Sequence, residues 1–153
     1  MNILSIDPSI NFCGYAIFNN KKLKQYALLK PKETDKTLID KCKTLYTCVR
    51  QLIHEYKINE LVIEIPEHWR VAGFVARESG SVYKLTFVCG VFTACAFEQN
   101  IKLTTYYPRE WKGQMKKHIV ANRLQSTYKD ITEINHNIAD AIGIGHHRLF
   151  GTV

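Results

Sequence analysis

The sequence lacks the features that mark secreted and membrane-spanning chains. It has no CxxC pair and no signal-peptide pattern, and its five cysteines are an odd number that does not suit a disulfide framework. The uncharged stretch over residues 85–97 has 13 residues, whereas a helix that spans a bilayer needs about 20. We therefore expect reduced core cysteines, a buried helix in place of a membrane span, and a cytoplasmic compartment.

The chain also lacks repeats, low-complexity tracts and linker-like segments, so no domain boundary is visible. Its 153 residues suit one domain with one full core. Apolar residues make up 46% and charged residues 23%, which excludes a disordered chain. We predict a single domain over residues 1–153.

Acidic residues are scarce in one long segment, residues 102–129, where Glu110 is the only one. Seven basic residues lie there: Lys102, Arg109, Lys112, Lys116, Lys117, Arg123 and Lys129. The segment carries +6 of the formal net charge of +7. Charge concentrated in this way favours a polyanionic partner, while a basic protein without such a partner and an anionic membrane surface are the alternatives.

The hydrophobic pattern predicts an α/β fold. Strands are expected at residues 2–7, 13–18 and 23–29, followed by a helix at 34–56 and a buried strand at 61–65. A loop at 67–78, a helix at 79–98 and a strand at 101–106 come next, then a helical region at 108–128 with a break at Gly113, and a last helix at 137–149. The sum is a mixed five-stranded sheet, an antiparallel meander followed by parallel strands, with helices on both faces.

Three acidic residues fall where the pattern excludes charge. Asp7 ends the first strand, Glu64 lies inside the buried fourth strand, and Asp140 lies between two alanines of the last helix. A buried carboxylate needs a compensating partner. If strands one and four are parallel neighbours, Asp7 and Glu64 meet, and a divalent cation such as Mg²⁺ or Mn²⁺ would relieve their repulsion.

Each of these acids also has a structural explanation. Asp7 before Pro8 could be a turn residue, Glu64 could pair with a neighbouring lysine or arginine, and Asp140 could face solvent. The three together, in this order, favour a shared site.

At this point the sequence resembles the RuvC family of the RNase H-like superfamily. The opening Ile3-Leu4-Ser5-Ile6-Asp7-Pro8-Ser9 with Gly14-Tyr15-Ala16 resembles the family's first two strands, and Leu61-Val62-Ile63-Glu64 resembles its strand-four acid. Asn137-Ile138-Ala139-Asp140-Ala141 resembles its last-helix motif, and Pro108-Arg109-Glu110-Trp111-Lys112 is similar to a segment of viral or phage-type RuvC-like proteins. The resemblance covers essentially the whole chain.

The resemblance implies a function and its site. Asp7, Glu64 and Asp140 would be catalytic and would hold two Mg²⁺ ions, with Mn²⁺ able to substitute, for hydrolysis of phosphodiester bonds in four-way (Holliday) or branched DNA. It also implies a homodimer that makes paired nicks, no membrane partner, and a location in the cytoplasm of a bacterial or virus-infected cell.

One position departs from the family pattern. Asn137 stands where the family has aspartate or histidine, three residues before Asp140, and His136 lies beside it. An amide offers an oxygen ligand without charge, so we expect weaker binding at one metal position or a shift toward Mn²⁺. His136 could substitute as a ligand, and capping of the helix is an equally good interpretation of Asn137.

The resemblance also suggests DNA contacts. Lys112, Lys116 and Lys117 resemble family lysines near the DNA backbone, with Arg109 in the same basic segment, although solvated helix charges are the alternative. Trp69 and Phe74 lie in the loop after Glu64, where the family carries an aromatic that wedges into the junction; anchoring in the core is the alternative.

Two other functions are compatible with the sequence. A nuclease of the same fold acting on RNA or flapped DNA, similar to the YqgF group, shares the opening motif. A catalytically inactive nucleic-acid-binding protein would explain Asn137. A two-domain sugar kinase or actin-like ATPase has a similar first strand, but the chain is too short for it.

Overall fold

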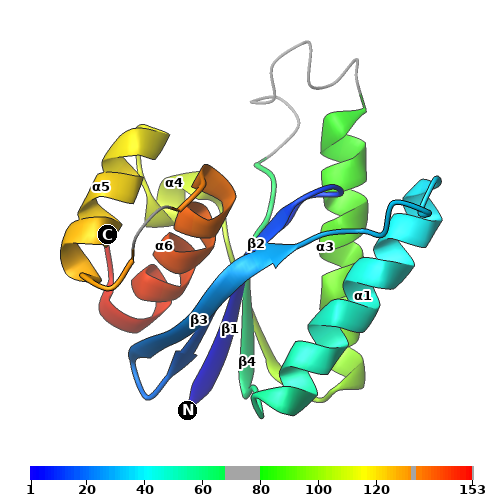
Figure 1. Cartoon of the computed structure of the whole chain (residues 1–153), viewed down its shortest axis with the longest axis horizontal. Helices are drawn as coiled ribbons and strands as arrows, with labels where there is room; N and C mark the ends of the chain where they lie inside the picture. Colours follow the sequence, from blue (N-terminus) through cyan, green and yellow to red (C-terminus); the bar gives the residue numbers. More distant parts are fainter. Residues whose placement is uncertain (68–79, 132–133, 153) are drawn as a thin grey trace.

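The structure is a computed structural model that describes residues 1–67, 80–131 and 134–152. The chain forms one five-stranded sheet, and Figure 1 shows helices packed on both sides of it. In chain order the elements are β1 (Asn2–Asp7), β2 (Cys13–Asn19), β3 (Lys22–Leu29), α1 (Leu38–Glu55), β4 (Glu60–Glu64), α3 (Ser81–Glu98), β5 (Lys102–Tyr106), α4 (Pro108–Trp111), α5 (Lys117–Thr127) and α6 (His136–Phe150). The elements match those predicted from the sequence, with shifts at several ends.

The sheet is mixed, as the sequence predicts. Its strand order is β3-β2-β1-β4-β5. The first three strands form the antiparallel meander, and β4 pairs in parallel with both β1 and β5. The pairing of Ile6 with Ile63 makes β1 and β4 direct neighbours whose carboxyl ends lie at the same edge of the sheet. The strand ends that carry Asp7 and Glu64 therefore meet.

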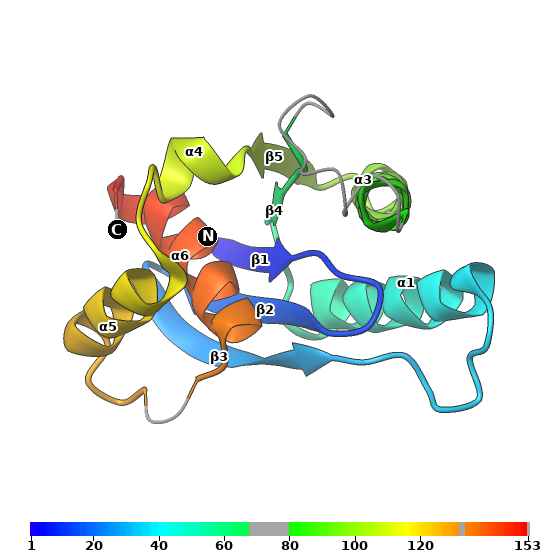
Figure 2. The same ribbon diagram turned by 90° about the horizontal axis from the view of Figure 1, so that it is seen from above.

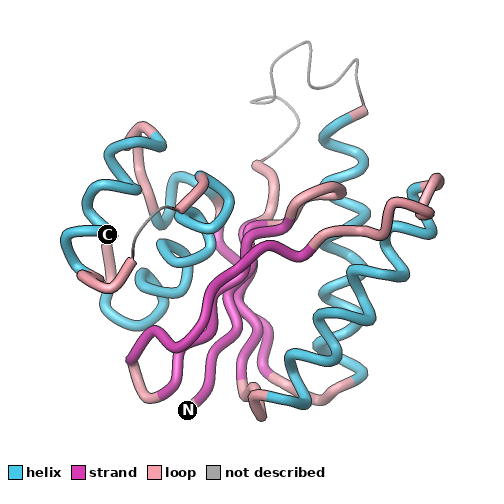
Figure 3. The backbone as a smooth tube through the Cα atoms, in the orientation of Figure 1, coloured by secondary structure: helices cyan, strands magenta, loops and turns pink. Residues whose placement is uncertain are grey.

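Two helical layers enclose the sheet (Figures 2 and 3). Helices α1 and α3 cover one face, and α4, α5 and α6 lie on the other. The strands contribute apolar side chains to a hydrophobic core on each face of the sheet, because successive side chains of a strand point to opposite faces. Leu61 and Ile63 pack toward α1 and α3, whereas Val62 joins the core under α6. By the same alternation, Asp7 and Glu64 share the α6 face.

Helix α1 begins later than the hydrophobic period suggests. Thr37 is its N-cap: its hydroxyl accepts a hydrogen bond from the backbone nitrogen of Asp40, and the Asp40 carboxylate accepts one from that of Thr37. This reciprocal capping starts the helix at Leu38. The predicted start at residue 34 is therefore wrong by one turn.

Helix α3 is buried on one side only. Val88, Cys89 and Phe92 enter the core, while Tyr83 and Phe97 are 64% and 69% exposed. The predicted burial of this helix holds for its inner face. In the described part of the chain, α3 is the one helix whose length and composition would suffice for a membrane crossing, a property that core helices of globular proteins share.

The basic segment after β5 is divided, as the sequence predicts. Gly113 adopts a φ of +56° between α4 and α5, a conformation that favours glycine. Helix α6 then starts at His136, one residue earlier than predicted. Its N-cap is Asn135, whose side chain accepts a hydrogen bond from the Ile138 backbone nitrogen at 2.9 Å. The alternative interpretation of Asn137 as the cap is therefore wrong.

Candidate active site

Three carboxylates from separate parts of the chain lie at one end of the sheet. Asp7 and Glu64 end the neighbouring strands β1 and β4, and Asp140 lies in the second turn of α6, 3% exposed. Their proximity shows in their electrostatics, because Glu64 and Asp140 both raise the pKa of Asp7. The structure thus brings together the three acids that the sequence singled out. The solvent-facing alternative for Asp140 is wrong.

Lys112 bridges two of these acids. Its Nζ lies 3.4 Å from Glu64 Oε2 and 3.1 Å from Asp140 Oδ2, and its side chain is 16% exposed. Burial lowers the pKa of Lys112, but the two carboxylates outweigh burial and hold that pKa above its ordinary value. The lysine is therefore the charged partner that Glu64 was expected to need. It points into the site and not toward bulk solvent.

Trp111 contacts the same oxygen of Glu64 as Lys112. Its indole Nε1 donates a hydrogen bond to Glu64 Oε2 at 2.7 Å, and its ring is completely buried. The ring lies so close to α6 that a Cβ at Gly143 would overlap it. Trp111 belongs to the Pro108–Lys112 motif, but its sequence alone predicts no role for the indole. Its position beside Lys112 was the available signal, but only the docking of α4 shows that the indole reaches Glu64.

The carboxylates cannot all ionise easily. Burial, followed by repulsion from Glu64 and Asp140, raises the pKa of Asp7 to about 8. Burial also raises the pKa of Glu64, although Lys112 and the Trp111 hydrogen bond act in the opposite direction. Such shifts collect at sites where a protein concentrates charge for binding or chemistry.

The donor set fits a hard divalent cation. Carboxylate oxygens are the ligands that Mg²⁺ and Mn²⁺ prefer. Asp140 Oδ1 is buried and has no hydrogen-bond partner among the described residues, which is costly unless a cation contacts it. Among the described residues, no three His, Cys, Asp or Glu side chains already form a metal-binding group. Metal binding would therefore require local adjustment of side chains around Lys112.

The two further candidate ligands occupy the start of α6. The Asn137 side chain donates from Nδ2 to the carbonyl oxygen of Phe12 at 2.9 Å, so this amide ties α6 to the β1–β2 turn. His136 is the first helical residue and is exposed. Three residues separate Asn137 from Asp140, which places the two on one face of the helix. The carbonyl oxygen of Asn137 thus remains the better placed candidate.

The predicted DNA-binding residues divide into four groups. Lys116 and Lys117 are exposed at the start of α5, and the charge of Lys117 lowers the pKa of Asp7. Arg109 is exposed but pairs with Glu67 at 3.2 Å. Lys112 faces the carboxylates. Trp69 and Phe74 lie outside the described residues.

The sheet order and the acids on β1, β4 and the closing helix define an RNase H-like nuclease fold. The family of crossover junction endodeoxyribonuclease RuvC matches residues 3–146. The chain therefore belongs to the RuvC family of crossover junction endodeoxyribonucleases.

Individual relatives agree with this assignment. RuvC of Hahella chejuensis is 26% identical over 152 residues, covering 94% of this chain and 84% of that protein. RuvC of Wigglesworthia glossinidia brevipalpis is 26% identical over 160 residues, covering 96% and 93%. The structure of T. thermophilus RuvC in complex with a Holliday junction substrate superposes with a TM-score of 0.76 and 18% identity, over 94% of this chain and 90% of that one, and supports the fold.

Replacing Asp7 by Asn should change how stability depends on pH in metal-free protein. The pKa of Asp7 is about 8 in the folded chain against an ordinary 3.8, so its ionisation favours unfolding. Its contribution to stability is complete below pH 4 and is lost as the pH rises through 8. In EDTA at pH 9, the free energy of unfolding of Asp7→Asn should be about 1 kcal/mol or more above that of the wild type. At low pH, the free energy of unfolding of the variant should not exceed that of the wild type.

Urea unfolding followed by circular dichroism across this pH range measures the difference. Asp130→Asn, which removes an exposed aspartate, is the matched control and should parallel the wild type. Parallel curves for Asp7→Asn and wild type would show that Asp7 does not titrate in the predicted range.

Replacing Trp111 by Phe should weaken metal binding while leaving the fold intact. The variant keeps an aromatic ring but removes the hydrogen bond to Glu64, so the pKa of Glu64 should rise further and its orientation should loosen. Loss of such a supporting contact typically costs about 10- to 100-fold in metal affinity. Calorimetric titration with Mn²⁺ measures it.

Tyr128→Phe is the control for Trp111→Phe. It removes a hydrogen bond to His146 from the same core without touching Glu64, so Mn²⁺ affinity should match the wild type. Equal Mn²⁺ affinities for Trp111→Phe and wild type would exclude a positioning role for the indole.

Proposed function

We propose that this chain is a structure-selective endonuclease that hydrolyses phosphodiester bonds in four-way DNA junctions, with Asp7, Glu64 and Asp140 as its catalytic residues. The observation that carries the proposal is the convergence of three carboxylates, one of them buried with an unpartnered oxygen, in a chain of the RuvC family. The alternatives of RNA or flap cleavage and of inactive binding become outcomes of the test below.

The carboxylates would hold two Mg²⁺ ions, for which Mn²⁺ would substitute. Divalent ions at such a site supply an activated water and stabilise the leaving oxygen. The Trp111 indole fixes one oxygen of Glu64 through its hydrogen bond. The Lys112 ammonium forms ion pairs with both Glu64 and Asp140, so the two carboxylates share one positive charge. Asn137 contributes at most a neutral oxygen, so one metal position should bind more weakly and favour Mn²⁺, with His136 as the alternative ligand.

The DNA backbone would approach from the side of α5. Lys116 and Lys117 are exposed at the start of that helix, close enough to the acids for Lys117 to affect Asp7. Arg109 lies on the preceding helix and would contact DNA after releasing Glu67. The T. thermophilus relative was solved with a Holliday junction substrate, which supports a junction as the ligand. Trp69 and Phe74 remain the predicted wedge residues.

A homodimer would provide the two sites that paired nicks require. The outer face of α3 presents Tyr83 and Phe97, both exposed, with Phe87 half-buried beside Tyr83 at a ring distance of 6.3 Å. This apolar face lacks a cover within the described part of the chain, and a second copy is the occupant that the family resemblance implies. The phage-type origin and the cytoplasmic location stay predictions from the sequence.

The decisive experiment compares labelled four-way junction, duplex, flap and RNA hairpin, each with Mg²⁺ and with Mn²⁺. We expect symmetric nicks confined to the junction. Asp7→Asn should abolish cutting while its junction affinity, measured by fluorescence anisotropy, stays within a few-fold of the wild type. If the protein cuts the flap or the RNA hairpin in preference to the four-way junction, the YqgF-like alternative is favoured. Binding without cutting in either metal would favour the inactive protein, and full cutting by Asp7→Asn would remove Asp7 from the site.

Replacing both Lys116 and Lys117 by Ala should weaken junction binding and flatten its salt dependence. Each phosphate contact contributes a slope of about −0.9 to the plot of log affinity against log salt, so loss of two should reduce the slope by nearly two. Lys22→Ala with Lys24→Ala, both exposed on β3, is the charge-matched control. An unchanged slope for the α5 variant would exclude a backbone role for these lysines.

Placing charge on the outer face of α3 should dissociate the homodimer. The wild type should have the mass of two chains in light scattering at micromolar concentration. Tyr83→Lys with Phe97→Lys should shift that mass to one chain, because two lysines would be desolvated at the interface. Phe150→Lys, which changes an exposed phenylalanine on α6, should not shift the mass. A monomeric wild type would contradict the paired-nick mechanism.

A further inference from the structure

Phe12 is exposed beside the catalytic end of the sheet. It lies in the short turn between β1 and β2, with 49% of its surface accessible. It lies two residues before Gly14, which pairs with Asp7 across the two strands. A single exposed apolar side chain is common on protein surfaces, so the case for a ligand contact at Phe12 depends on the groups around its ring.

The turn that carries Phe12 is held from several sides. The backbone nitrogen of Ser9 donates to Cys13 Sγ, which in turn donates to the Ser9 carbonyl oxygen at 2.7 Å. Lys41 Nζ donates to Asn11 Oδ1 at 2.7 Å, which ties the turn to α1. Asn137 Nδ2 donates to the Phe12 carbonyl oxygen, which ties it to α6. The ring is therefore presented on a fixed backbone.

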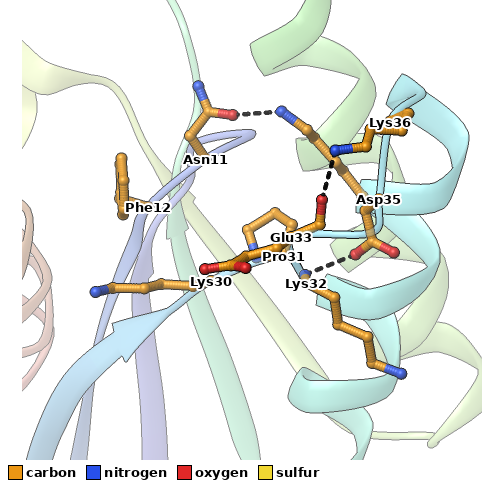
Figure 4. A pocket seen from close by; sticks show the side chains of 9 residues that line it. Asn11, Phe12, Lys30, Pro31, Lys32, Glu33, Asp35 and Lys36 are labelled. Carbon is orange, nitrogen blue, oxygen red and sulfur yellow. Dashed lines mark hydrogen bonds between the residues drawn. The ribbon is translucent and has the colours of Figure 1, made fainter.

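Basic residues line a hollow beside this ring. Lys30 Nζ lies 5.5 Å from the centre of the Phe12 ring. Figure 4 shows Phe12 and Lys30 at one side of the hollow, which has a volume of about 550 Å³ and which Lys32, Lys36 and Lys41 also line. Two acids, Glu33 and Asp35, line it too, and the Asp35 carboxylate accepts a hydrogen bond from the Lys32 backbone nitrogen at 2.8 Å. Four lysines and two acids thus line the hollow, and the Lys30 ammonium lies over the ring.

We propose that Phe12 and Lys30 form a nucleotide subsite for the DNA strand that enters the active site. The base of an unpaired nucleotide stacks on the Phe12 ring, and its flanking phosphate meets the Lys30 ammonium. Stacking on an aromatic ring accepts any base, and a basic groove follows the backbone. This subsite rests on the proposed function and places a strand on the α1 side of Asp7, opposite the lysines of α5.

A matched pair elsewhere on the chain provides the control. Phe150 is 51% exposed and has Lys21 Nζ 5.9 Å from its ring centre. Phe150 is the last residue of α6, whereas Asn137 lies in the first turn of that helix, about 20 Å away along the axis. The two pairs therefore share composition and exposure but differ in their distance from the carboxylates.

The experiment measures binding of a fluorescein-labelled junction by anisotropy in EDTA, where no cutting occurs. Phe12→Ala should weaken binding about five-fold or more, Lys30→Ala should weaken it and reduce the salt slope, and Phe12→Trp should bind at least as well as the wild type. Phe150→Ala and Lys21→Ala should stay within two-fold. Thermal unfolding of each variant accompanies the binding data.

Equal affinity for Phe12→Ala and wild type would overturn the subsite, as would equal losses for Phe12→Ala, Phe12→Trp and Phe150→Ala. The same variants are also titrated with a single-stranded oligodeoxythymidine. If the wild type neither binds nor cuts a junction, the proposed function fails. The single-strand titration then judges the subsite separately: loss of affinity in Phe12→Ala with retention in Phe12→Trp supports it, and no such difference overturns it.

Discussion

The close approach of α6 to the sheet is the constraint on which the site depends. A Cβ at Gly14 would overlap the backbone of Asn137, so only glycine allows the helix to lie this near β2. Ser5 on β1 strengthens the contact, since its hydroxyl donates to the Ala141 carbonyl oxygen at 2.7 Å. Ser5 and Asp7 share one face of the strand. The helix that Ser5 binds therefore also brings Asp140 over Asp7.

That packing brings carboxylates of like charge together, and their repulsion has to be compensated within the site. Three carboxylates lie close together, and among the described residues one ammonium, that of Lys112, forms ion pairs with two of them. Burial, followed by repulsion from Glu64 and Asp140, raises the pKa of Asp7 to about 8, although Lys112 acts in the opposite direction. Divalent cations would replace the proton of Asp7 and contact the unpartnered oxygen of Asp140. Under the proposed function, a divalent cation at this site would relieve the repulsion between these carboxylates.

The sequence predicted those parts of the fold that depend on local periodicity. The five strands, the parallel pairing of β1 with β4 and the break at Gly113 are set by alternation, short turns and a glycine, and all are confirmed. The convergence of the acids followed from the strand order. The predicted start of α1 and the predicted cap of α6 were wrong, because each helix end is set by a single capping hydrogen bond from a backbone nitrogen to a side chain. The position of such a hydrogen bond does not alter the hydrophobic period of the sequence.

What the sequence could not predict is which way each charge faces. Of the seven basic residues in the segment after β5, Lys102 pairs with Glu60, Arg109 with Glu67, and Lys112 with two of the acids. In a sum of charges along the sequence, all three residues are available to bind DNA. In the folded chain, all three form ion pairs with carboxylates.

The turn at Gly113 explains how one short segment serves both purposes. On its near side, α4 directs Trp111 and Lys112 inward to Glu64; on its far side, Lys116 and Lys117 are exposed at the start of α5. A continuous helix would place Lys112 and Lys116, four residues apart, on one face. The positive φ at Gly113 separates them. An inward charge that organises the carboxylates and an outward charge that can meet a phosphate therefore come from neighbouring turns of the same segment.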